Sequence, residues 1–86
     1  MLTPRQMRVV ATMLVVLRRI LIQKLVADFK DDRREVDRLY GVFLRNVKAL
    51  PPIMRSEVFL LEYVSLPAKR QIEREGVLAQ NGRYNY

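Results

Sequence analysis

The sequence predicts an all-α protein, and three observations support that class. Apolar residues recur at the period of a helix along most of the chain. Neither glycine nor proline occurs between residues 5 and 40, so nothing interrupts that period early in the chain. Half of the residues are hydrophobic, which excludes disorder by composition. We expect a long amphipathic N-terminal helix over about residues 4–50, a Pro-Pro turn, an antiparallel second helix, a short charged C-terminal helix and an extended tail.

The first helical stretch covers residues 3–30. Thr3 is a candidate N-cap, and Pro4 suits the first helical position. Arg8 and Arg18 bracket only nine uncharged residues, whereas a membrane span needs about 20 apolar residues. We therefore expect an amphipathic helix that packs on a partner. Polar side chains share one stripe of this helix, namely Arg5, Arg8, Thr12, Arg19, Gln23 and Lys30.

The same stretch has the composition of a mitochondrial transit helix, with five basic residues before its first acid, Asp28. Since Met1 is present, the segment would act as a mitochondrial targeting signal that is not cleaved. We expect residues 1–30 to be a basic amphipathic helix, with uncleaved targeting as a compatible second role, in the matrix or on the matrix face of the inner membrane. Its candidate contacts to a partner or to lipid are Arg5, Arg8, Arg18, Arg19 and Lys24.

The second stretch runs from about Asp32 to Leu50. Asp32, followed three residues later by Glu35, fits a capping box. No residue between positions 28 and 34 forces a break, however. The sequence therefore leaves open whether residues 4–50 form two helices or one rod of roughly 68 Å.

Proline organises the rest of the chain. Pro51-Pro52 ends the second stretch, and such a short connection favours an antiparallel helix over residues 53–65. Pro67 is expected to break or kink the chain again, and Gly76 to cap a short charged helix over residues 67–75. In the polar tail, residues 76–86, three side chains are candidates for stacking on RNA or docking in a protein groove: Arg83, Tyr84 and Tyr86.

The composition argues against an enzyme. Cysteine and histidine are both absent, so no disulfide, Cys/His zinc site, catalytic thiol or imidazole base can form. The three glycines lie far apart and make no phosphate loop. We expect no catalytic residue, metal or cofactor. The net charge of +7 and the pI near 10.4 suit nucleic acid, anionic lipid or an acidic protein as partner.

One stretch resembles a known family. Leu39-Tyr40, Phe43-Leu44-Arg45 and Leu50-Pro51-Pro52 are similar to the first helix of LYR-motif proteins, which are small, basic, three-helix mitochondrial proteins. Within that family the likeness is greatest to the succinate dehydrogenase assembly factor type, and it covers about residues 36–70. The resemblance implies an LYR-like helical hairpin over residues 31–75 and a partner-binding face made of Leu39, Tyr40, Phe43 and Arg45.

The chain departs from the family pattern in several places. Gly41 stands where the motif normally has arginine, and Leu66-Pro67 replaces an expected Phe-Arg pair. The family's third helix is short or missing, and an extra helix precedes the motif. Family partners include iron–sulfur biogenesis machinery and the acyl chain of mitochondrial acyl carrier protein. That acyl chain needs a complete three-helix tunnel, so acyl carrier protein is not expected here. Plain core packing is the alternative explanation for Leu39, Tyr40 and Phe43.

Three hypotheses of function follow. The first is a non-catalytic accessory subunit of a large mitochondrial assembly, such as a respiratory complex or the ATP synthase, which binds protein neighbours and also contacts anionic lipid. The second is an LYR-type assembly chaperone for succinate dehydrogenase or another iron–sulfur client. The third is an RNA-contacting mitochondrial ribosomal protein, for which RNA would be the partner.

Overall fold

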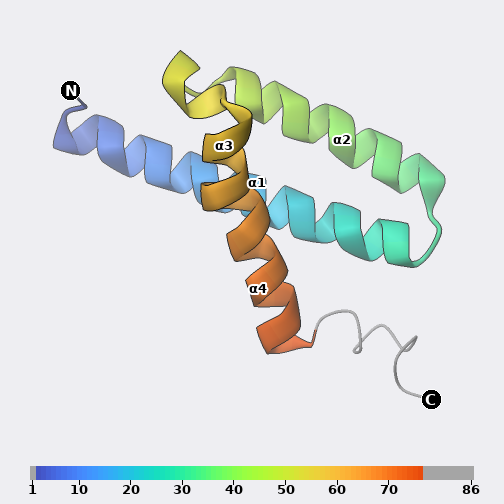
Figure 1. Cartoon of the computed structure of the whole chain (residues 1–86). Coiled ribbons are helices and arrows are strands. Elements are labelled where there is room, and N and C mark those ends of the chain that lie inside the picture. Colours follow the sequence, from blue (N-terminus) through green and yellow to red (C-terminus); the bar gives the residue numbers. More distant parts are fainter. Residues whose placement is uncertain (1, 77–86) are drawn as a thin grey trace.

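A computed structural model of the chain describes residues 2–76, and within that range all regular structure is helical, which confirms the all-α class. Figure 1 shows α1 and α2 side by side and antiparallel, with a third helical segment crossing α1. The elements in chain order are α1 (Pro4–Phe29), α2 (Arg33–Lys48), η1 (Pro52–Arg55), α3 (Glu57–Leu60), η2 (Leu61–Ser65) and α4 (Leu66–Glu75). Of these, η1 is a 3₁₀ turn and η2 is a π-helical turn.

The N-terminus of α1 is closed by the predicted cap. The Thr3 hydroxyl accepts a hydrogen bond from the Gln6 backbone N–H at 3.2 Å, and the Gln6 side chain accepts one from the Thr3 N–H at 2.8 Å. This reciprocal pair is a capping box, with Pro4 at the first helical position. Two of the donors that every helix leaves free at its start are thereby satisfied.

Residues 4–50 form two helices rather than one rod, because the chain reverses at Asp31. Asp31 has a left-handed backbone, with φ of 58°. Its N–H donates to the Asp28 carbonyl at 3.0 Å, and the Asp32 N–H donates to the Ala27 carbonyl at 2.9 Å. This is a Schellman motif with aspartate in the place usually taken by glycine. The Asp32 side chain then caps α2 by accepting from the Glu35 N–H at 3.2 Å.

Replacing Asp31 with glycine is expected to raise the free energy of unfolding by about 1 kcal/mol, because a left-handed backbone strains every residue that has a Cβ. A urea titration followed by circular dichroism measures the change. Lys30→Gly is the matched control, since Lys30 has a φ of −87° and gains nothing from glycine. A less stable Asp31→Gly variant would mean that the 3.4 Å contact of Asp31 with Arg33 outweighs the strain.

The helical segment after Pro51-Pro52 differs from the prediction in its packing. Residues 57–75 (α3, η2 and α4), here called the crossing segment, pack across α1 rather than antiparallel to α2. The reason lies in the spacing of Val64, Ala68 and Ile72, which are buried one turn apart on one side. As a consequence α1 packs against both α2 and the crossing segment.

Pro67 does not interrupt the crossing segment, contrary to the predicted break. Proline lacks the N–H that would bind the carbonyl four residues back, which is that of Tyr63. The chain widens into the π-turn η2 just before this point, where the Leu66 N–H donates to the Leu61 carbonyl. The Tyr63 carbonyl instead accepts a 2.7 Å hydrogen bond from Nε of Arg18 on α1. A side chain of the first helix thus supplies the donor that Pro67 lacks.

The core is small and lies where the helical parts meet. Leu17, Leu50 and Val64 are fully buried together, one each from α1, the turn after α2 and the crossing segment. A second cluster joins Ile20 and Ala27 of α1 to Leu39 of α2. Within the described range no polar or charged residue is buried, so apolar contacts alone fill this interior.

Candidate interaction surface

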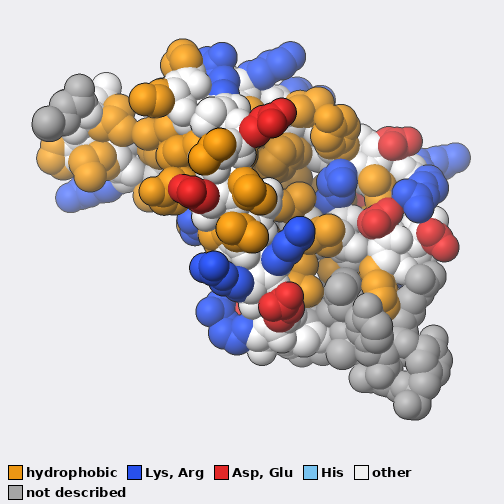
Figure 2. Space-filling model, viewed as in Figure 1, with side chains coloured by type: hydrophobic (Ala, Val, Ile, Leu, Met, Phe, Trp, Pro, Cys, Tyr) orange, Lys and Arg blue, Asp and Glu red, His pale blue; other side chains and the backbone are white. Residues whose placement is uncertain are grey.

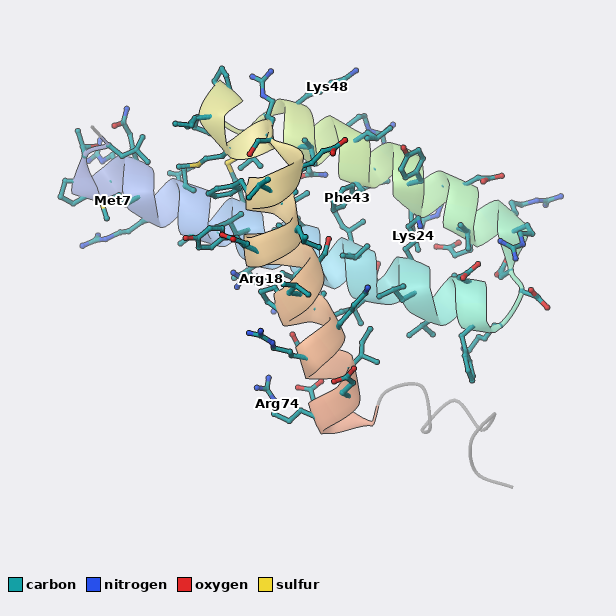
Figure 3. The ribbon with its side chains drawn as sticks, viewed as in Figure 1. Met7, Arg18, Lys24, Phe43, Lys48 and Arg74 are labelled. Atoms are coloured by element: carbon teal, nitrogen blue, oxygen red, sulfur yellow. The ribbon has the colours of Figure 1, made fainter. Side chains whose placement is uncertain are left out.

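The four LYR-like residues do not share one face. Leu39 is buried in the core, and Phe43 packs against both core clusters. Figure 3 shows Phe43 between α1 and α2. Tyr40 is 52% exposed, and Arg45 is also exposed. Only Tyr40 and Arg45 of this set are therefore available to a partner in this conformation.

The five predicted contact residues of α1 divide into two groups. Arg18 donates to the Tyr63 carbonyl, and Figure 3 shows it where the crossing segment passes over α1. The Lys24 ammonium lies 5.8 Å from the centre of the Tyr40 ring, within cation–π range. Arg5, Arg8 and Arg19 are exposed. The tail residues Arg83, Tyr84 and Tyr86 lie outside the described residues.

The most exposed apolar side chains lie between the Pro-Pro turn and Pro67. Ile53 of η1 is 81% exposed and Val58 of α3 is 67% exposed. Leu61 is exposed as well, and because it follows Val58 by three residues the two lie on the same side of their helix. We call Ile53, Val58 and Leu61 the apolar surface. Figure 2 shows hydrophobic side chains concentrated over α3 and the N-terminal half of α1.

Sequence reasoning assigned these residues to a helix but did not place them on the surface. A signal was present in EVFLLEYVS, residues 57–65, where apolar residues occur all round the helix. One side of a helix can pack on α1, so the remaining apolar side chains are left outside. Next to them the Tyr63 ring stacks on that of Phe59, with the ring centres 4.6 Å apart. This stack stiffens the segment that carries the apolar surface.

A groove of about 540 Å³ lies between α1 and α2 near their loop. Three of its charged residues, Asp32, Glu35 and Arg38, already have hydrogen-bond partners. Asp32 caps α2, and the Arg38 guanidinium donates to the Glu35 carboxylate with Nε at 3.1 Å from the oxygen. That hydrogen bond lowers the pKa of the Glu35 carboxyl and raises the pKa of Arg38. Both interactions stabilise the start of α2, and neither points to an activated acid or base.

Among residues 2–76 no cluster of acidic side chains has the arrangement needed to hold a metal ion. In the same range, every helix is too short or too polar to cross a membrane. Comparison with family models, curated proteins and solved structures finds no match for this chain. Its function is therefore argued from the surface and contacts of the molecule.

Proposed function

We propose that this chain is a non-catalytic accessory subunit of a larger mitochondrial assembly and binds a neighbouring protein through the apolar surface. The supporting observation is the balance between buried and exposed apolar side chains. Among residues 2–76, eight hydrophobic residues are buried, two of them alanine, whereas ten large hydrophobic ones remain exposed. Exposure of large apolar side chains on this scale supports a surface that a partner covers.

Burial of these apolar side chains would contribute to association with a neighbour. Full burial of an Ile, Val or Leu side chain contributes roughly 1.5–3 kcal/mol. Three such side chains, Ile53, Val58 and Leu61, would together offset the lower range of the association cost, which begins at about 4 kcal/mol. Exposed arginines around them add pairing with acidic groups of the neighbour.

The mitochondrial part of the proposal rests on the N-terminal sequence. The first 27 residues contain five basic and no acidic side chains, and all five basic ones lie on the helix α1. We propose the matrix or the matrix face of the inner membrane as the location, with a respiratory complex or the ATP synthase as the assembly.

The proposal predicts that Ile53→Ser/Val58→Ser/Leu61→Ser releases the chain from its assembly. Tagged full-length protein is expressed in its native cells, and mitochondrial extracts in mild detergent are resolved on blue-native gels. The unaltered chain should migrate with a large complex, and the triple variant should be lost from it. Circular dichroism of the purified variant checks that it still folds, as expected for exposed positions.

Tyr40→Ser/Leu44→Ser on α2 is the matched control, because it removes two other exposed apolar side chains. The control should stay in the complex. An unaltered chain that migrates as a free 10.2 kDa species contradicts the proposal. Release of the α2 variant alone would instead support the LYR-type chaperone hypothesis, since Tyr40 belongs to the LYR-like set.

A further inference from the structure

One side of α1 carries a row of arginines with no acidic neighbour on the helix. Arg5, Arg8 and Arg19 are exposed, and in the described part of the chain no ion pair involves them. At 100° per residue the three lie within about 60° of arc, and the row spans roughly 21 Å. No acid precedes Asp28 in the sequence, so the positive potential along this row is not cancelled locally. We call these three residues the arginine row.

Exposed valines border the arginine row. By helical geometry Val15 lies along one edge, and Val9 and Val16 lie along the other. All three are exposed. The row also faces away from the core, because Leu17 precedes Arg19 by two residues and points to the opposite side of α1. The outer side of α1 is thus a cationic strip with apolar margins.

An apolar groove opens beside the N-terminal end of the row. It has a volume of about 300 Å³ and runs between the start of α1 and the turn that follows α2. Arg5 stands in its wall together with Leu2, Met13 and Pro51. A cation beside an apolar groove matches the chemistry of a phospholipid, which joins a phosphate to a hydrocarbon chain.

We propose that the arginine row docks α1 lengthwise on an anionic lipid surface. The guanidinium groups would lie at the phosphates, while the arginine stems and the bordering valines contact the outer hydrocarbon layer. RNA is favoured less, because the margins of the row are valines and offer no ring for base stacking. The inference goes beyond the proposed function, since it concerns a different surface from Ile53, Val58 and Leu61.

The test measures co-sedimentation of the full-length protein with vesicles of phosphatidylcholine, with and without phosphatidylglycerol. Each basic residue near an anionic leaflet strengthens binding roughly fivefold, so Arg5→Gln/Arg8→Gln/Arg19→Gln should weaken binding about a hundredfold. Arg34→Gln/Arg45→Gln/Lys48→Gln is the matched control on α2. It removes the same number of positive charges, also from exposed positions. It should weaken binding by less than about tenfold, because only the long-range attraction of these charges to the vesicle is lost.

A fluorescence readout reports which side meets the lipid. The chain has no tryptophan, so Val16→Trp introduces a single reporter beside the row. Its emission should shift to the blue on addition of anionic vesicles, whereas that of Leu44→Trp on α2 should not. Equal loss of binding in the two triple variants, equal binding to pure phosphatidylcholine, or no shift at position 16 would overturn the proposal. Binding to RNA without binding to vesicles would also overturn it. Neither the vesicles nor the RNA contain a protein partner, so the outcome is independent of the proposed assembly.

Discussion

Replacing Leu17 with alanine is expected to lower the free energy of unfolding by about 2–5 kcal/mol. Leu17 is fully buried at the point where α1, the turn after α2 and the crossing segment meet. Removing its methyl groups leaves a cavity that three helical parts would have to close together. The stability of a native domain is about 5–15 kcal/mol in total, so this one change removes a large share of it. Urea titration followed by far-UV circular dichroism measures the loss.

Val16→Ala is the matched control for this measurement. Val16 is the preceding residue on the same helix and is exposed, so its truncation should change stability by less than about 0.5 kcal/mol. If Leu17→Ala were as mild as Val16→Ala, the three-way junction would not be the core of the molecule.

Replacing Arg18 with methionine is expected to lower the free energy of unfolding by about 1–3 kcal/mol, because the Tyr63 carbonyl loses its donor. Methionine keeps an unbranched apolar side chain on α1, so the packing of the stem is largely retained. Thermal and urea unfolding of the purified protein give the difference. Arg19→Met serves as the control, since Arg19 is exposed and the structure shows no ion pair or side-chain hydrogen bond for it in the described residues.

The cause of the Arg18 effect can be isolated with Pro67→Ala. Alanine restores a backbone N–H at position 67, which can bind the Tyr63 carbonyl in a regular helix. Arg18→Met should therefore lower stability less in the Pro67→Ala background, with a coupling of about 1 kcal/mol in a double-mutant cycle. Strictly additive effects would show that Arg18 stabilises the fold by another contact.

The sequence predicts the local features of this fold well. Thr3 and Asp32 cap helices as their side chains suggest, Pro51-Pro52 follows the end of α2, and Gly76 closes α4 with a φ of 62°. Each of these features depends on a few adjacent residues, so the chemistry of those residues is enough. The sequence does not decide the reversal at Asp31, because aspartate enters the left-handed region only when a Schellman motif and helix packing hold it there.

Features that depend on distant residues are predicted less well. The direction of the crossing segment follows from packing against Leu17 and Arg18, which lie far from it in the sequence. The same limit applies to the candidate surface. Leu39 and Tyr40 are neighbours in one motif, yet the rotation of α2 against α1 buries the first and exposes the second. Spacing alone is compatible with either outcome.

The connections between the helical parts also have a consequence for the order in which the molecule folds. The α1–α2 hairpin is closed by only residues 30–32, whereas the bond from Arg18 to Tyr63 joins residues 45 positions apart. Closing a short loop requires less chain entropy than closing a long one, so the hairpin forms early and the crossing segment docks late. During synthesis the residues of the hairpin are also made before those of the crossing segment. Val58 and Leu61, which we assign to contact with a neighbouring protein, therefore lie on the segment that docks last. The neighbour can bind them before the crossing segment has packed on α1.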